Sequence, residues 1–306
     1  MGRSHHNLYN QMKQSILNGF TPGISKREDK LKGEYLEKSK IYSYRDKEGL
    51  MDVAKDFSRW MKESYPSIKK MNQISPDIVN RYLNSKSQTC TSHTISQYAT
   101  RIDKIGRLGE SMFNCRMNMQ ATDIPKGKES MRTIAMKESD YTKIVDVSSK
   151  AKGYLAVKLS HAFGLRVSET VKVRPCDIKD NKLIIYKSKG GKTRILTIET
   201  KEQKEIINKL KEVAVKESRE KNKPILNINK SSVNKWLNTR CRQLGINTYN
   251  DHKSSIHSIR KNWAIREYRK ELLNNDKKMA WANVSEKLGH GRDREDLREV
   301  YLPGEK

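Results

Sequence analysis

The stretch I-H-S-I-R-K-N-W-A at 256–264 begins the segment that decides how this chain folds and what it does. His257 and Arg260 are three residues apart, and a helix places residues with this spacing on one face. An imidazole and a guanidinium on the same helix face are suited to hold an anion.

Two shorter motifs follow in the same segment, L-G-H-G-R at 288–292 and V-Y-L at 300–302. His290 lies between two glycines, in a turn that ends an apolar helix. Tyr301 comes at the end of a short charged segment. Two histidines, an arginine and a late tyrosine together predict a site for an anion with a phenol beside it. Each motif alone has a simpler explanation (a structural Arg–His pair, a helix cap, a packing tyrosine), so the prediction rests on their order.

The charge of the chain predicts a nucleic acid partner. Its 306 residues hold 63 lysines and arginines against 36 acidic residues, which gives a net charge of +27 and a pI near 9.8. A polyanion neutralises such an excess. There is no apolar run long enough to span a bilayer, and the N-terminus leads into polar sequence without a signal peptide. We therefore expect no membrane partner and a cytoplasmic, nucleoid-associated protein.

The cysteines and acidic residues predict neither a metal nor a cofactor. The four cysteines have no C-x-x-C spacing, so they fit neither a zinc site nor a disulfide framework. They are Cys90, Cys115, Cys176 and Cys241. The sequence also lacks a P-loop and a clear cluster of metal-binding acids. We expect reduced thiols, no cofactor and no metal.

Composition and spacing divide the chain into four segments. Residues 1–45 are polar and lysine-rich, and we expect a basic flexible lead or a DNA-touching arm with one short helix within 11–17. Residues 46–118 show helical periodicity with basic outer faces, which predicts a helical core DNA-binding domain. A simple bundle with solvated lysines would show the same pattern. Residues 119–137 have proline, glycine and mixed charge without period, as in a linker, and a second domain spans 138–306.

One helix start in the first domain has a clear signal. Ser75 is a good N-cap, and Pro76 after it suits the first helical position. A longer helix is expected over 91–114, with isoleucines and leucines on its inner face.

The second domain is predicted to be mainly helical with one basic β-hairpin, an α+β fold. Residues 182–186 and 194–198 are rich in β-branched side chains and are expected to be strands. Gly190 and Gly191 between them signal a hairpin turn, with Lys189 at its rim. Helices are expected over 138–149, 153–162, 201–217, 231–243, 258–273 and 278–288.

Arg166 breaks a local rule, because the first turn of a helix favours acids over cations. A departure of this kind is an indication of function. A bound anion or a buried carboxylate would compensate the charge, and Glu169, three residues later, is predicted to orient the guanidinium.

Five motifs of the second domain resemble, in the same order, those of the tyrosine recombinases, the phage integrase family. The motifs are G-L-R-V-S-E (164–169), K-S-K-G-G-K-T-R (187–194), H-S-I-R (257–260), L-G-H-G-R (288–292) and V-Y-L (300–302). The resemblance implies a helical core-binding domain followed by a catalytic domain.

The resemblance also implies a role for six residues. Arg166 and Arg260 match the arginine pair that clamps the scissile phosphate. Lys189 matches the hairpin lysine that acts as general acid. The remaining three match the two histidines and the nucleophile of the family, and they are His257, His290 and Tyr301.

In this family the tyrosine attacks a DNA phosphate to give a 3′-phosphotyrosyl link and a free 5′-hydroxyl, without metal or ATP. The implied partners are double-stranded DNA at specific recombination sites and three further copies of the chain, in a homo-tetramer that forms a Holliday junction. Accessory DNA-bending proteins are a further partner class. The chemistry agrees, because a free phenol has a pKa of about 10 and needs help to react at neutral pH. Two guanidiniums can meet the non-bridging oxygens with paired donors.

Two features depart from the family pattern. His290 and Tyr301 are eleven residues apart, a longer spacing than the pattern has, and five residues follow Tyr301. They leave open the contact between subunits and the delivery of Tyr301 to its own site. Two alternatives therefore stand beside the recombinase: a catalytically inactive DNA-binding repressor on the same fold, and a basic nucleic-acid-packaging protein.

Overall fold

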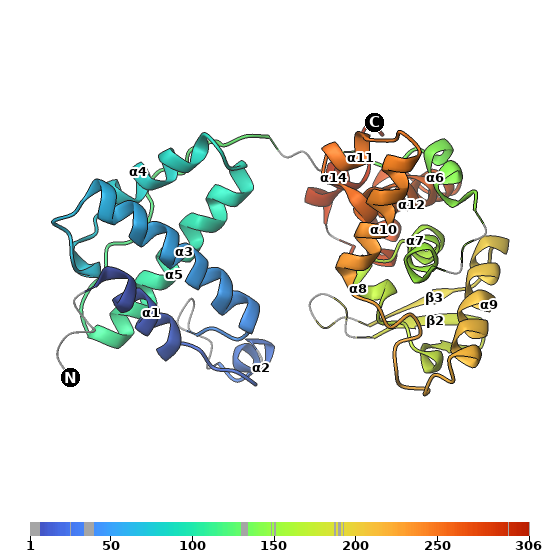
Figure 1. Ribbon diagram of the computed structural model, residues 1–306, viewed down its shortest axis with the longest axis horizontal. Coiled ribbons are helices and arrows are strands. Elements are labelled where there is room, and N and C mark those ends of the chain that lie inside the picture. The colour runs from blue at the N-terminus through green and yellow to red at the C-terminus, as the bar shows by residue number, and fades with distance from the viewer. Residues whose placement is uncertain are drawn as a thin grey trace. The chain divides into compact units, whose positions relative to one another are not determined.

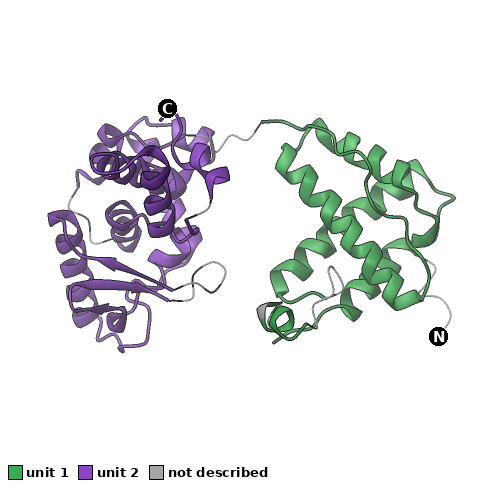
Figure 2. Ribbon diagram, turned by 180° about the vertical axis from the view of Figure 1, so that it is seen from behind, with its two compact units in different colours: residues 1–130 green, residues 131–306 purple. Residues whose placement is uncertain are grey.

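A computed structural model describes most of the chain and divides it into two compact units, residues 1–130 and 131–306 (Figure 2). The described residues are 7–24, 26–33, 40–129, 134–147, 149, 151–186, 188, 191, 193–292 and 294–305. Each unit has hydrophobic core clusters of its own.

The described part of unit 1 is helical (Figure 1). Its helices are α1 (Leu8–Asn18), α2 (Lys26–Leu31), α3 (Tyr44–Ser64), α4 (Pro76–Ser87) and α5 (Ser92–Phe113), with a short 3-10 turn at Met71–Gln73. The core forms where α1, α3 and α4 pack against α5. It is aliphatic and aromatic, with Phe57 and Tyr82 fully buried.

The predicted helix starts in unit 1 are confirmed. The Ser75 hydroxyl accepts the backbone N–H of Ile78, and Pro76 is the first residue of α4. Thr91 caps α5 in the same way, and this helix agrees with its predicted range within one residue at each end. Short polar side chains therefore fix the first turn of each helix, as N-cap chemistry requires.

The N-terminal segment differs from its prediction as a flexible lead or arm. Helix α1 packs on α3 and α5, and it buries Leu8, Met12 and Ile16 in the core of unit 1. These residues recur every four positions, so one face of α1 is apolar and has to be covered.

The segment expected to be a linker is shared between the two units. Met119 is buried in the core of unit 1, and Lys128 forms a β-bridge with Thr91. Met136 is buried in unit 2, where its N–H donates to the Ser258 carbonyl at 2.9 Å.

Unit 2 is mainly helical with a small antiparallel sheet, as predicted. Its helices are α6 (Glu138–Val145), α7 (Lys152–Phe163), α8 (Val167–Thr170), α9 (Lys201–Lys216), α10 (Lys230–Gln243), α11 (Thr248–Asp251), α12 (Ser255–Glu271), α13 (Lys277–Lys287) and α14 (Arg298–Tyr301), with 3-10 turns at Pro175–Asp177 and Glu295–Leu297. Helix α7 packs against α9, α10 and α12, and Figure 1 shows it near the middle of the unit.

The sheet has the strand order β1-β2-β3, with β1 (Ile178–Lys179), β2 (Lys182–Ile185) and β3 (Arg194–Thr197). Strands β2 and β3 form the predicted antiparallel pair, with Ile184 opposite Ile195. Strand β1 was not predicted, because two residues are too short for a periodic pattern.

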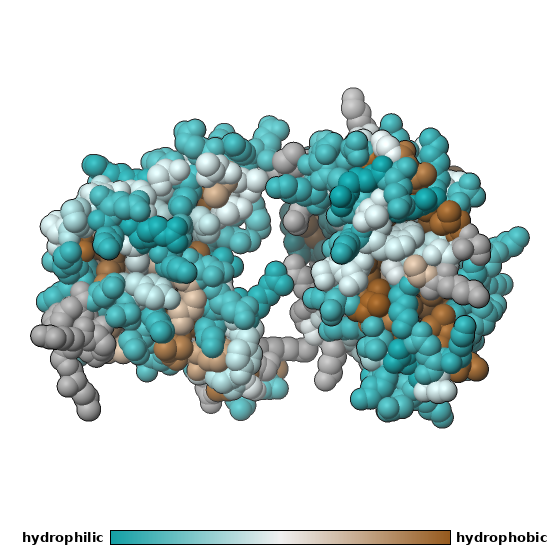
Figure 3. Space-filling model, in the orientation of Figure 1, coloured by the Kyte–Doolittle hydropathy of each residue, from teal (hydrophilic) through white to brown (hydrophobic). Residues whose placement is uncertain are grey.

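No helix in the described ranges is long and apolar enough to cross a membrane. Hydrophilic side chains cover most of the face drawn in Figure 3, and apolar side chains form small separate patches there. This surface agrees with the high charge of the chain.

Candidate active site

Helix α12 carries two of the predicted site residues. It begins at Ser255, three residues earlier than predicted, so His257 and Arg260 lie in its first two turns. Arg260 is 1% exposed, and its Nη1 and Nη2 donate to the carbonyls of Gly164 and Leu288. Arg260 therefore connects the loop after α7 with the end of α13.

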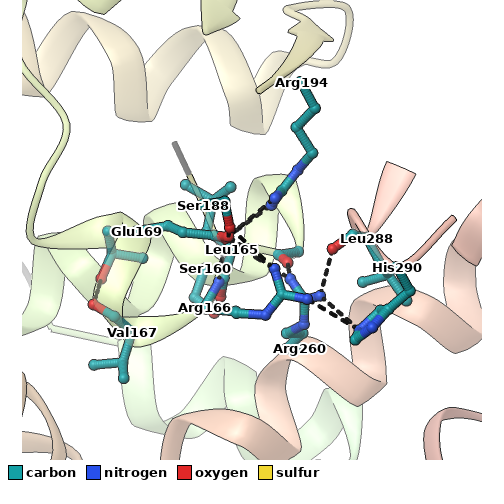
Figure 4. A network of polar contacts seen from close by, with 12 residues as sticks. Ser160, Leu165, Arg166, Val167, Glu169, Ser188, Arg194, Arg260, Leu288 and His290 are labelled. Atoms are coloured by element: carbon teal, nitrogen blue, oxygen red, sulfur yellow. Dashed lines mark hydrogen bonds and ion pairs between the residues drawn. The ribbon is translucent and has the colours of Figure 1, made fainter. Parts of the chain in front are cut away.

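Arg166 lies directly before α8 and is held by Glu169, as the sequence predicted. The Glu169 carboxylate accepts the backbone N–H of Arg166 at 2.8 Å and its Nη1 at 2.9 Å. The Ser188 hydroxyl and the Arg194 guanidinium bind the same carboxylate (Figure 4). The guanidinium of Arg166 is thereby fixed at the edge of the site.

His290 lies where the two predicted arginines converge. Its Nε2 is 3.1 Å from Nη2 of Arg166 and 3.3 Å from Nη2 of Arg260 (Figure 4). Guanidinium nitrogens are donors only, so Nε2 is the acceptor in both contacts. Gly289 before it has φ +76°, which allows the tight turn after α13.

Tyr301 reaches the site of its own chain. It is the last residue of α14 and is 4% exposed, with its ring packed beside Trp281. Its Oη is 3.0 Å from His290 Nε2 and 3.3 Å from Nε of Arg260. The long spacing after His290 is taken up by the 3-10 turn and α14.

His257 approaches Tyr301 from the first turn of α12. The two rings meet edge to face, with their centroids 5.5 Å apart. The structure thus brings together five of the six predicted residues. Lys189, the sixth, lies outside the described residues.

Burial and charge set the electrostatics of the site. Burial lowers the pKa of Arg260 to about 10, which still leaves the guanidinium charged at neutral pH. Burial alone would raise the pKa of Glu169, but the hydrogen bonds of Arg194 and Ser188 and the charge of Arg260 hold it well below its ordinary range. The site is therefore cationic, with one ionised carboxylate that orients the cations.

Arg194 ends the motif at 187–194, but the resemblance implied no role for it. Its signal was the alternation of β3, which puts Arg194 on the same face as buried Leu196. A cation on the inner face of a strand requires a carboxylate partner, and this one has Glu169.

The geometry defines what the site can do. Two fixed guanidiniums can bind two oxygens of a phosphate, and a phenol lies within hydrogen-bond distance of an imidazole that can accept its proton. Among the described residues, no group of histidines, cysteines and acids could hold a metal ion.

Comparisons with known proteins identify the fold. The XerH site-specific recombinase in its post-cleavage complex with palindromic difH substrate matches with a TM-score of 0.69 and 15% identity, over 98% of this chain and 93% of XerH. A lambda integrase tetramer bound to a Holliday junction matches with a TM-score of 0.62 and 17% identity, over 94% of this chain and 79% of the integrase. A search of curated protein sequences finds no match. At these identities the structural likeness shows the fold alone.

Fold and family model together define a tyrosine recombinase, an enzyme that exchanges DNA strands at specific sites. The family model "Phage integrase family" matches residues 134–292, more than half of the chain, so the chain belongs to that family. The match ends before Tyr301, whose assignment therefore depends on its distances to His290 and Arg260.

Proposed function

We propose that this chain cuts and rejoins double-stranded DNA at specific recombination sites, with Tyr301 as the nucleophile. The observation that carries the proposal is the convergence on His290 Nε2 of Tyr301 Oη and of an Nη atom from each arginine, all within 3.3 Å. These four groups lie on four separate parts of unit 2, so local structure alone does not explain their meeting.

The scissile phosphate is bound by Arg166 and Arg260. Their Nη2 atoms face the imidazole nitrogen Nε2 of His290. A phosphate oxygen is a stronger acceptor for a guanidinium than a neutral ring nitrogen. On binding, the phosphate therefore draws both donors to itself, and His257 on the same helix as Arg260 is a further ligand for it.

Cleavage forms a bond from Tyr301 Oη to phosphorus and breaks the bond from phosphorus to the 5′ oxygen. The phenolic proton passes to Nε2 of His290, which no longer accepts from the arginines. The guanidiniums stabilise the negative charge that grows on the non-bridging oxygens. Lys189, by its place in the family motif, gives the 5′ oxygen its proton. The tyrosyl phosphodiester keeps the bond energy, so a 5′-hydroxyl can reverse the step without ATP.

Unit 1 is proposed to hold the DNA through a polar hollow beside α5. One face of α5 contributes a set of side chains that can contact phosphates and base edges. They are His93, Ser96, Gln97, Thr100, Arg101 and Lys104, and Lys26 and Lys40 also line the hollow. The mixture of cations and amide or hydroxyl groups suits a surface that both positions DNA and recognises its sequence.

Strand exchange is proposed to occur in a homo-tetramer, as in the lambda integrase tetramer bound to a Holliday junction. Because Tyr301 lies in the site of its own chain, each subunit would cleave with its own tyrosine. Such an assembly works at the nucleoid, with accessory DNA-bending proteins where the site requires them.

The test is a suicide DNA substrate, nicked near the crossover point, with candidate sites taken from DNA that flanks the coding region. The protein should give a covalent DNA–protein band on a denaturing gel. Tyr301→Phe should bind the same DNA with unchanged affinity and give no band, because it lacks the attacking oxygen.

Two outcomes would contradict the proposal. Cleavage by Tyr301→Phe would assign the nucleophile to another tyrosine, with Tyr268 and Tyr249 as the next candidates. Tight, specific binding without any covalent band would favour the alternative, a repressor on the recombinase fold.

A further inference from the structure

Arg194 binds the same carboxylate as Arg166, and the reaction proposed above does not use it. It is the first residue of β3, and its Nη1 and Nη2 donate to the two oxygens of Glu169 at 2.9 and 2.8 Å. The side chains of Arg194 and Glu169 are 10% and 4% exposed. A two-point contact fixes the direction of a carboxylate as well as its charge.

Two further residues bind this carboxylate, Arg166 of the candidate site and Ser188 beside it. Arg166 binds it through its backbone N–H and its guanidinium, and the Ser188 hydroxyl donates to it (Figure 4). Ser188 follows β2 and Arg194 begins β3. Glu169 therefore ties the ends of both strands to the start of α8.

On its other side, Arg194 lies against the turn that carries His290. A Cβ added at Gly289 would be 2.8 Å from Nη1 of Arg194. The guanidinium thus fits between the Glu169 carboxylate and the Gly289 backbone, and it occupies space that any larger residue at 289 would take.

Stability does not account for a cation in this place. Burying a charged pair costs desolvation that the attraction often fails to offset, and an apolar side chain of similar size is commonly as stable. The Nε of Arg194 is buried and has no hydrogen-bond partner in the described part of the chain, which adds to the cost. What the arginine supplies is a rigid connection between two parts of the site.

We propose that Arg194 is a positioning residue: it holds Arg166, through Glu169, and His290, through the Gly289 turn, in the arrangement that binds and cleaves a phosphodiester. The expected effect on the cleavage rate rests on the proposed function, whereas the expected effect on the positions of Arg166 and His290 does not.

The first experiment needs no DNA. Full-length protein labelled with ¹⁵N in histidine reports His290 Nε2 by NMR, assigned by its absence in His290→Asn. Arg194→Met should shift this resonance, because Arg166 loses its fixed contact with Nε2. Arg219→Met is the matched control, since Arg219 also pairs with a glutamate and has a buried Nε without a partner in the described chain. It should leave the resonance unchanged. An unchanged resonance in Arg194→Met would overturn the proposal.

The second experiment uses the suicide DNA substrate. Arg194→Met should lower the rate of covalent complex formation about 10²-fold, the size of effect that misplaced groups have, while DNA affinity stays within about 3-fold. Arg194→Lys should recover only part of the rate, because an ammonium cannot make the two-point contact.

A double-mutant cycle separates positioning from general stability. In an Arg166→Ala background, Arg194→Met should lower the rate of covalent complex formation by less than about 10-fold, because the arginine that Arg194 positions is gone. Equal fold losses in both backgrounds would overturn the proposal. If the wild-type protein gives no covalent product, the proposed function fails instead, and the histidine spectrum alone decides on Arg194.

Discussion

Lys261 is a second buried cation on α12, directly after Arg260, and it is 1% exposed. Burial lowers its pKa from 10.5 to about 8. Between these two pH values the unfolded chain holds a proton that the folded chain has lost, so the free energy of unfolding rises with pH in this window. Below pH 8 both states are protonated, and the cost of burying the charge is present in full.

Lys261→Met should therefore remove the part of the rise in the free energy of unfolding between pH 8 and 10.5 that Lys261 causes. Urea unfolding at pH 7 and pH 10 measures this difference. Lys270→Met on the same helix is the control, because its side chain is 62% exposed and its ion pair is weak. An undiminished rise with pH in Lys261→Met would show that another group titrates in this window.

At the scale of elements, the junction between α7 and α8 depends on Gly164. Its φ is +62°, and an added Cβ would lie 2.4 Å from the ring of Trp263 on α12. Its carbonyl also accepts a hydrogen bond from Arg260. The residue thus ends one helix, lets a second helix approach closely and fixes a guanidinium of the site.

Gly164→Ala should destabilise unit 2 by on the order of 2–4 kcal/mol, the sum of a left-handed backbone cost and overpacking. Gly245→Ala is the matched control, because Gly245 has φ +69° and nothing within 4 Å of an added Cβ. It should cost about 1–2 kcal/mol, the backbone term alone. Thermal unfolding of both variants gives the comparison. Equal losses of stability in the two variants would mean that the Trp263 side chain moves aside without a cost in free energy.

Elements with local signals were predictable, and those defined by distant contacts were not. The Ser75 cap and the β-branched strands stand in consecutive residues, so sequence alone located them. The Arg194–Glu169 pair joins residues 25 positions apart on a strand and a helix, and no periodicity encodes it. Helix α1 is a different case: a short helix was expected there, but the high lysine content of the segment concealed the apolar stripe at Leu8, Met12 and Ile16 that packs into the core.

The candidate site was likewise predictable where the signal is local and not where it depends on distant contacts. The order of five motifs was enough to select Arg166, Arg260, His290 and Tyr301, and the structure places their polar atoms around one imidazole nitrogen. The sequence left open whether Tyr301 reaches its own site. That question depends on how α14 packs against α12, a long-range contact that spacing cannot decide.

At the scale of the whole molecule, we propose that unit 1 recognises DNA and that unit 2 carries the chemistry. The predicted site residues that the structure describes lie in unit 2, and the polar hollow beside α5 lies in unit 1. The net charge of +27 provides many phosphate contacts, so DNA binding should weaken steeply with salt.

A fragment of residues 134–306 should therefore keep the covalent step and lose most of the affinity. Its core clusters contain no residue of unit 1, so it should unfold cooperatively in urea, which is the check before any activity test. On the suicide substrate at saturating DNA and low salt it should give the covalent band, while its affinity falls by about 10²-fold or more, because the phosphate contacts of unit 1 are gone. The same fragment with Tyr301→Phe should give no band. A folded fragment that binds DNA but forms no covalent product would mean that unit 1 supplies a group the cleavage step requires.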